Sequence, residues 1–343
     1  MTPNKSYKKV FAGITVFMLI CFIANISLGS VFIPWIDTLS SLIGGPVEKE
    51  SWRHIIVDYR LPKALTAIIV GSGLGVSGLL MQTLFRNPLA GPFVLGISSG
   101  STLGVALLIL GSTFAGATFS SFLVSKWGLV IAASLGSVLV LFAVMLMSIK
   151  VRDTMAILII GLMFGSITSA IVSVLSYFAP ADQLQQYVFW GFGSLGNLSW
   201  LDVLIFFGIS FLGMLLSVAS IKPLNTLLLG ENYARSLGLN IKTSRFTIII
   251  ATGLLAGSST AFAGPIAFIG LAVPHLTRQL FHTSNHKTLI PAVVLIGSII
   301  MLICDSIAQL PSSEYTLPIN AITSLIGAPV VIWLLVRKRK MLF

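Results

Sequence analysis

Two side chains that could carry chemistry, His275 and Asp305, stand inside long apolar runs. An ionisable residue inside a membrane is costly, so each is a candidate for relaying a proton or contacting a substrate. A relay needs several such residues in series, and runs 155–178 and 316–336 contain no Asp, Glu, Lys, Arg or His. The pattern therefore argues against a proton- or sodium-driven carrier. His275 directly follows Pro274, so its ring can instead bond backbone groups that the proline frees, and both roles stay open.

Other chemistries lack the residues that they need. Cys21 and Cys304 fall inside apolar runs, where a thiol acts as a small packing group, so we expect no disulfide and no metal site. No cluster of Asp, Glu, His or Cys has the spacing of a catalytic site, so we do not expect an enzyme. No Gly-Lys dipeptide occurs, so the chain has no phosphate-binding loop ending in Gly-Lys-Ser or Gly-Lys-Thr. We expect no cofactor on this chain, and any ATP must be hydrolysed by a partner.

The elements that position these residues must be membrane helices. Charged residues make up only 9% of the 343 residues and apolar residues 56%, whereas a soluble domain carries about 25% charge. A helix needs about 20 apolar residues to cross a bilayer. The sequence therefore predicts one all-α, polytopic domain, residues 1–343, with ten spans at 9–29, 62–85, 92–111, 127–149, 155–178, 200–219, 245–263, 266–281, 288–308 and 316–336.

The basic residues assign a side to each loop. An even number of spans places both termini on one side, and cytoplasmic loops carry the excess of Lys and Arg. Of the 21 Lys and Arg residues, 16 fall on the side of the termini. We therefore expect cytoplasmic termini in a bacterial plasma membrane. The net charge of +11 follows the ends of the spans and does not indicate nucleic acid. The five basic residues expected outside are Lys49, Arg53, Arg60, Lys63 and Lys126.

Glycines and prolines indicate how the spans are organised. Gly73, Gly75 and Gly78 lie within a span, where small residues let helix backbones approach closely. Gly91-Pro92 and Gly264-Pro265 precede similar sequences on opposite sides of the membrane, which an inverted repeat would produce. Gly-Pro turns are also common at helix starts, so the similarity could arise by chance. Outside the membrane, residues 179–199 carry Tyr187, Phe189 and Trp190, which suit an interfacial helix.

The stretch Arg86–Pro92 is a polar hinge between two apolar runs. Pro88 and Pro92 fix the backbone, and the side chain of Asn87 can bond to amides of the turn. Together with other motifs in shared order and spacing, this stretch resembles the permease subunits of ABC importers for iron chelates, haem and cobalamin. The resemblance covers nearly the whole chain. Its motifs are Arg60-Leu61-Pro62-Lys63, Asn87-Pro88-Leu89-Ala90, Gly96-Ile97-Ser98-Ser99-Gly100, Trp190 with Gly193-Ser194-Leu195, Gly264-Pro265-Ile266, Pro274-His275, Asp305 and Leu325-Ile326-Gly327-Ala328-Pro329.

The resemblance implies partners for this chain. A second permease copy would complete a homodimer, two ATPase subunits would bind ATP and Mg, and an extracytoplasmic binding protein would deliver the cargo. It implies that segment 220–244 couples the permease to the ATPases through a short helix ended by Gly238. We expect Ala234 to keep one face of that helix small enough to enter a groove on the partner. The coupling residues are Gly230, Glu231, Ala234, Arg235, Leu237 and Gly238.

The resemblance and the residue positions also predict a gate, a docking site and hinges. We expect Asn87, Pro88 and Leu89 to narrow the pathway on the cytoplasmic side. Arg60 and Lys63 would pair with carboxylates on the binding protein, or else anchor a helix end at lipid headgroups. Gln309 stands where the family often has a third cation, so docking would depend more on these two. The hinges are Gly264, Pro265, Pro274 and His275.

The predicted function is therefore ATP-driven import of a large metal chelate, with an iron–siderophore complex as first choice. Cobalamin and haem would use the same mechanism, and the uncharged central spans suit all three cargoes. An ion-coupled secondary transporter with inverted repeats is the alternative from another class. Dependence of uptake on ATP or on an ion gradient separates the two.

Overall fold

The computed structural model describes residues 7–111, 125–150, 154–310, 313 and 315–336, and these form helices joined by turns and loops. Each of the ten expected spans is confirmed as a helix. They are α1 (Lys8–Ser27), α4 (Leu61–Leu84), α5 (Ile97–Ile109), α7 (Lys126–Lys150), α8 (Thr154–Phe178), α10 (Trp200–Ala219), α13 (Ile241–Thr252) continued by η4 (Gly253–Gly257) and α14 (Ser258–Ala263), α15 (Ile269–Phe281), α16 (His286–Ala308) and α17 (Ile319–Val336).

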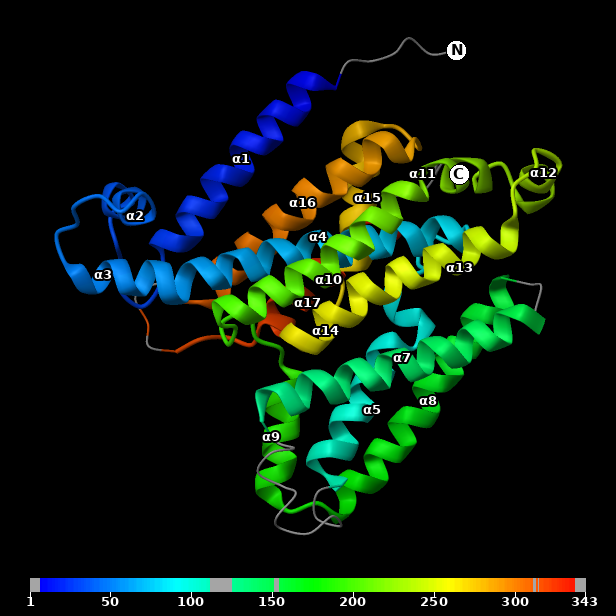
Figure 1. Ribbon diagram of the computed structural model, residues 1–343, viewed down its shortest axis with the longest axis horizontal. Helices are drawn as coiled ribbons and strands as arrows, with labels where there is room; N and C mark the ends of the chain where they lie inside the picture. Colours follow the sequence, from blue (N-terminus) through cyan, green and yellow to red (C-terminus); the bar gives the residue numbers. More distant parts are fainter. Residues whose placement is uncertain (1–6, 112–124, 151–153, 311–312, 314, 337–343) are drawn as a thin grey trace.

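Short helices cap the two ends of this bundle (Figure 1). One end carries α2 (Trp35–Leu42), α3 (Glu50–His54) and α9 (Ala181–Gly191), and the other carries α11 (Ile221–Leu227) and α12 (Glu231–Ser236). The helix α9 confirms the expected interfacial helix within 179–199. The rings of Tyr7 and Phe11 pack on Phe281 at centroid distances of 5.4 and 5.0 Å, so α1 begins beside the cytoplasmic end of α15. The basic residues Lys5, Arg152 and 337–340 lie outside the described residues.

The second span is longer than the sequence suggested. We expected residues 30–61 to lie outside the membrane helix, but α3 and the π-helical turn η1 (Ile55–Arg60) run directly into α4. The combined helix has 35 residues, about 52 Å at 1.5 Å per residue. The hydrocarbon core is only about 30 Å thick, so the start of this helix projects past the outer face.

Two helices are half-length, and each follows an irregular break. The helices α5 and α15 have 13 residues each, about 20 Å, which is too short to cross the membrane. Before α5 the chain forms the 3₁₀ turn η2 (Pro92–Leu95) and then Gly96 at φ 76°; before α15 it reaches Phe268 at φ 65°. The breaks therefore enter the membrane from opposite faces, as the inverted repeat predicts. Both helices start later than expected because these residues leave the α conformation.

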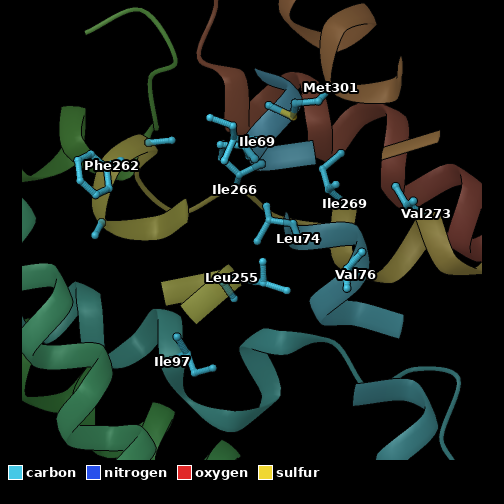
Figure 2. Close-up of a cluster of buried hydrophobic side chains, with 14 of the residues drawn as sticks. Ile69, Leu74, Val76, Ile97, Leu255, Phe262, Ile266, Ile269, Val273 and Met301 are labelled. Atoms are coloured by element: carbon cyan, nitrogen blue, oxygen red, sulfur yellow. The ribbon is translucent and has the colours of Figure 1, made fainter. Parts of the chain in front are cut away.

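The helix α4 is the centre of the packing. A Cβ atom added at Gly78 would lie 1.6 Å from the carbonyl oxygen of Gly270 in α15, and one added at Gly71 would lie 2.2 Å from that of Gly297 in α16. The expected role of small residues in close helix approach is thus confirmed. Figure 2 shows Leu74 of α4 in the buried cluster with Ile266 from the outer break and Leu255 of η4. The helices α5, α7 and α8 pack mainly on one another as a second group (Figure 1).

Candidate functional site

The turn expected to form the cytoplasmic gate is stabilised by its own asparagine. The side-chain oxygen of Asn87 accepts a hydrogen bond of 2.9 Å from the amide of Leu89, as the sequence predicted. The backbone amide of Asn87 donates to the backbone carbonyl of Gln82, which ties the turn to the end of α4. Leu89 is 42% exposed at the tip of this turn. The turn therefore presents one apolar side chain from a fixed backbone.

The structure brings the expected hinge residue and the expected gate together. The Nε2 atom of His275 lies 2.7 Å from the carbonyl oxygen of Pro88. Because the carbonyl only accepts, Nε2 carries the hydrogen and donates it. His275 is buried in α15 next to Pro274. The sequence left open whether this ring bonds backbone groups freed by Pro274 or has a role in transport, and it gave no sign that the acceptor belongs to the gate turn.

A second contact, which the sequence did not indicate, joins the end of α4 to α15. The side-chain amide of Gln82, at the end of α4, donates to the backbone carbonyl of Leu271 at 3.2 Å. Its side-chain oxygen accepts from the guanidinium of Arg278, also at 3.2 Å. Gln82 is fully buried. The signal available in the sequence was a glutamine in an otherwise apolar helix, where a polar side chain needs a partner.

Within the coupling segment, the short helix α12 lies between two glycines with positive φ. Gly230 has φ 101° before α12, and Gly238 has φ 82° after it. The carboxylate of Glu231 pairs with Arg245 of α13 at 2.9 Å, which fixes α12 against the bundle. Gly238 follows the end of the helix, as the sequence predicted.

Ala234 does not occupy the position expected of it. Its side chain is 0% exposed and packs against this chain, so it is not available to a groove on a partner. The apolar side chains that α12 and its flanks expose are those of Leu229, Tyr233 and Leu237, at 60%, 55% and 59%. Ala234 is buried because its side of α12 packs against this chain, where α12 contacts α11 and α13.

Arg86 connects the coupling segment to the gate. Its guanidinium lies over Gly230, where an added Cβ would be 3.5 Å from a terminal nitrogen. Arg86 itself has φ 48° and directly precedes Asn87. The start of α12 and the gate turn are therefore in van der Waals reach of each other through one side chain.

The two residues expected to dock a binding protein have partners within the chain. Lys63 pairs with Asp305 at 3.1 Å, and the lysine side chain is 21% exposed. The other carboxylate oxygen of Asp305 accepts from Asn25 at 2.9 Å and from Gln309 at 2.7 Å. Gln309, the departure noted in the sequence, is thus one of three partners of Asp305. This cluster joins the outer ends of α1, α4 and α16.

Arg60 is held more tightly still. Its guanidinium donates to the carbonyls of Ile26 and Ser27 at 2.8 Å each and to that of Val31. Only 9% of the residue is exposed. These carbonyls end α1, where backbone acceptors lack helical partners. Arg60 therefore closes the corner between α1 and the following loop, and docking through it stays a prediction.

The outer break is braced by the 192–197 loop and by the start of α17. The carbonyl of Ala263, just before Gly264, accepts from the amide of Ser194 at 2.9 Å. The side chain of Asn320 accepts from the amide of Ala267 at 3.1 Å. Gly264 has φ 75°, and a Cβ there would lie 2.9 Å from the carbonyl oxygen of Trp190. Both Gly264 and Pro265 thus lie in a tightly packed break, and Asn320 is a bracing residue that the sequence did not indicate.

A cavity of about 400 Å³ lies at this outer end. The Lys63–Asp305 pair contributes to its wall, together with the 192–197 loop and the start of α17. The same loop braces the outer break. An occupant of the cavity would therefore contact both the charged cluster and the loop that holds the break.

Comparison with known proteins identifies the type of transporter. The model of the FecCD transport family matches residues 17–337. The chain belongs to this family. It is 36% identical to the vitamin B12 import system permease of Klebsiella pneumoniae, over 95% of this chain and 93% of that protein. It is 32% identical to the hemin transport permease of Yersinia pestis, over 94% and 95%, and 34% identical to the molybdate import permease of Haemophilus influenzae, over 96% and 95%.

A solved structure supports the same conclusion. A metal-chelate type ABC transporter in an inward-facing conformation superposes with a TM-score of 0.84 at 32% identity, covering 96% of this chain and all of that one. As a FecCD family member, the protein is the membrane permease subunit of an ABC importer in a bacterial plasma membrane.

Proposed function

We propose that this FecCD permease imports a metal chelate, with an iron–siderophore complex as cargo, through a pathway between two copies of the chain. The observation that carries the proposal is the position of the gate turn. On one side its Pro88 carbonyl is bonded by His275 at 2.7 Å, and on the other Arg86 lies against the coupling segment at Gly230. A displacement of α12 would therefore reach the gate directly.

The energy would come from two partner ATPases that bind ATP and Mg. Leu229, Tyr233 and Leu237 form the exposed apolar surface of the coupling segment, and we assign them to the ATPase contact. Glu231 and Arg235 begin and end α12, and the Glu231–Arg245 pair would transmit the motion of α12 to α13. ATP binding and hydrolysis would then shift the population between inward- and outward-open states.

An iron–siderophore complex is our first choice of cargo, and the uncharged spans suit it as they suit other bulky chelates. The helices α8 and α17 carry no ionisable side chain, and α8 exposes the hydroxyls of Ser166, Ser169 and Ser173 along one face. Such a surface suits a bulky chelate held by shape and hydroxyl contacts. Cobalamin and haem have the same requirements, and relatives that carry them share 36% and 32% identity.

Reconstitution would test the cargo and the energy source together. Permease, ATPase and binding protein are placed in proteoliposomes, and uptake of ferric siderophores, haem, cobalamin and molybdate is compared at equal concentration. We expect ATP-dependent uptake of a ferric siderophore and none of molybdate. Uptake of cobalamin or haem alone would reassign the cargo. Uptake without ATP, driven by a proton or sodium gradient, would overturn the importer and support a secondary carrier.

The role of Arg86 can be separated from folding. In Arg86→Ala, ATPase subunits should still bind, because Leu229, Tyr233 and Leu237 are unchanged, but less cargo should be carried per ATP hydrolysed. Lys287→Ala serves as the control, because Lys287 is an exposed cation at the start of α16 and has no assigned role in coupling. An unchanged transport-to-hydrolysis ratio in Arg86→Ala would contradict the proposed link.

Docking of the binding protein is proposed at the outer cavity through Lys63. Its ammonium is partly exposed beside Asp305, so a carboxylate of the partner could share it. Exposed pairs of this kind mainly set orientation and association rate. In Lys63→Gln/Asp305→Asn, which removes both charges and so leaves no buried carboxylate unpaired, association should be slower and less salt-dependent; an unchanged association rate would contradict this contact.

A further inference from the structure

The outer helix α2 has its polar and apolar faces the wrong way round for a helix in water. Thr38 and Ser41 are 0% and 3% exposed and face the protein. Trp35, Ile36 and Leu39 face outward and are 62%, 61% and 40% exposed. A surface helix in water buries its apolar face and exposes its polar one.

The buried hydroxyls are satisfied, which makes the arrangement specific. The hydroxyl of Thr38 lies 3.0 Å from that of Ser27, at the end of α1, and donates to the carbonyl of Pro34. The hydroxyl of Ser41 donates to the carbonyl of Asp37 at 2.7 Å. Of these bonds, the one between Thr38 and Ser27 reaches another element, so it fixes which face of α2 meets α1.

The exposed apolar surface extends beyond the helix on both sides. Phe32 before α2 and Ile43 after it are 63% and 84% exposed. Within the helix, Trp35, Ile36 and Leu39 follow the three- and four-residue spacing of one face, and Phe32 and Ile43 extend the exposed apolar surface at its two ends. We call these five residues the outer apolar face.

The position of α2 indicates what covers this face. Figure 1 shows α2 foreshortened, close to end-on, at the outer end of the molecule, whereas α1 and α4 are seen along their length. The axis of α2 therefore crosses the direction of the spans and lies along the plane of the membrane. The helix packs on the outer end of α1, whose own Phe17 and Ile20 are 50% and 58% exposed. The helix that α2 packs on thus exposes apolar side chains along its middle, as a helix in contact with lipid does.

We propose that Phe32–Ile43 is an interfacial anchor whose outer apolar face lies at the boundary between headgroups and acyl chains of the outer leaflet. Trp is the residue type most enriched at this level of a bilayer, because its ring is apolar and its N–H is polar. Interfacial helices bury their apolar face about 5–10 Å into this boundary. Arg60 stabilises the chain that leads into the anchor, because its guanidinium bonds the carbonyls of Ile26, Ser27 and Val31 between the end of α1 and the start of α2.

Depth-dependent quenching tests the proposal. The chain has six tryptophans, and a variant that keeps only Trp35 is reconstituted in vesicles of phosphatidylglycerol and phosphatidylcholine brominated at chosen acyl positions. Bromines near the headgroup should quench Trp35 more than bromines near the bilayer centre, and aqueous iodide should quench it little. The matched control carries Trp35→Phe and Glu48→Trp in the same background. Glu48 is exposed in the loop after α2, so its tryptophan should respond to iodide and not to bromine.

Two outcomes would overturn the anchor. Quenching of Trp35 by iodide alone would place the face in water. Protection of Trp35 from both quenchers would mean that protein covers it, either a second copy or the binding protein. If the single-tryptophan chain fails to fold, a spin label at Ile36→Cys, in a chain that keeps all its tryptophans but lacks Cys21 and Cys304, gives the same answer. It should relax faster with oxygen, which concentrates in lipid, than with a water-soluble nickel chelate, and the reverse ratio would refute the proposal.

Discussion

The Nε2 atom of His275 donates a hydrogen bond of 2.7 Å to the carbonyl oxygen of Pro88, across 187 residues of sequence. The bond joins a half-length helix, entered from the outer face, to the turn that borders the inner face. The side chain of Gln82, at the end of α4 that leads into this turn, adds a second connection by bonding Leu271 and Arg278 of α15. The gate turn is therefore held by side chains of α15 and not only by its own prolines.

Loss of this bond should loosen the gate turn. A hydrogen bond contributes about 1 kcal/mol net, which corresponds to about a fivefold change in an equilibrium. In a chain that lacks Cys21 and Cys304 and carries Leu89→Cys, we expect His275→Ala to speed labelling from the cytoplasmic side about fivefold. Thr277→Val is the control, because the Thr277 hydroxyl bonds only within α15, to Val273. Equal labelling in all three chains would show that the bond does not restrain the turn.

Substitutions on the two faces of α12 should separate folding from partner binding. Leu237→Arg changes a side chain that is 59% exposed, so the permease should keep its melting temperature but lose its ATPase partner in a pull-down. Ala234→Arg forces a long charged side chain into a fully buried position, where overpacking alone costs about 1–3 kcal/mol. Its melting temperature should fall. Retained stability in Ala234→Arg would place that methyl on the partner surface after all.

Neutralising one member of the Lys63–Asp305 pair should cost more than neutralising both. Lys63→Met leaves the carboxylate of Asp305, which is 3% exposed, without a cation. Removing one partner of a buried pair costs up to about 3–5 kcal/mol, and the partial exposure of Lys63 places our expectation at the lower end. Lys63→Met/Asp305→Asn should recover most of the loss in thermal unfolding. Additive losses in the double variant would mean that the two charges are not coupled.

Two glycines in one helix provide a matched pair for helix packing. Gly78→Ala would place a methyl 1.6 Å from the backbone oxygen of Gly270, so α4 and α15 must separate. Gly73→Ala would place one 3.4 Å from the hydroxyl of Ser259, an ordinary contact. We expect Gly78→Ala to abolish uptake and lower the melting temperature, and Gly73→Ala to leave both near the parent values. Similar behaviour of the two variants would contradict the close approach.

The sequence predicted what depends on local chemistry and on hydropathy. It located ten spans and the side-chain cap of Asn87, because apolar length and turn residues determine these features. It could not predict the partners of Arg60, Lys63 and Gln82, since these lie up to 242 residues away along the chain, as Lys63–Asp305 does. The direction in which Ala234 points was equally hidden, because it depends on how α12 docks against α13.

The contact between Gly78 and Gly270 leaves no room for one helix to roll or tilt against the other. The helices α4 and α15 should therefore move as one rigid body, with the braced outer break at one end and the gate turn at the other. If this rigid pair of helices tilts, its outer end and its inner end move in opposite directions. The outer break and the gate turn would then open alternately, which any pump needs if it is not to leak. This coupling would follow from Gly78 and Gly270, two residues that lack a side chain.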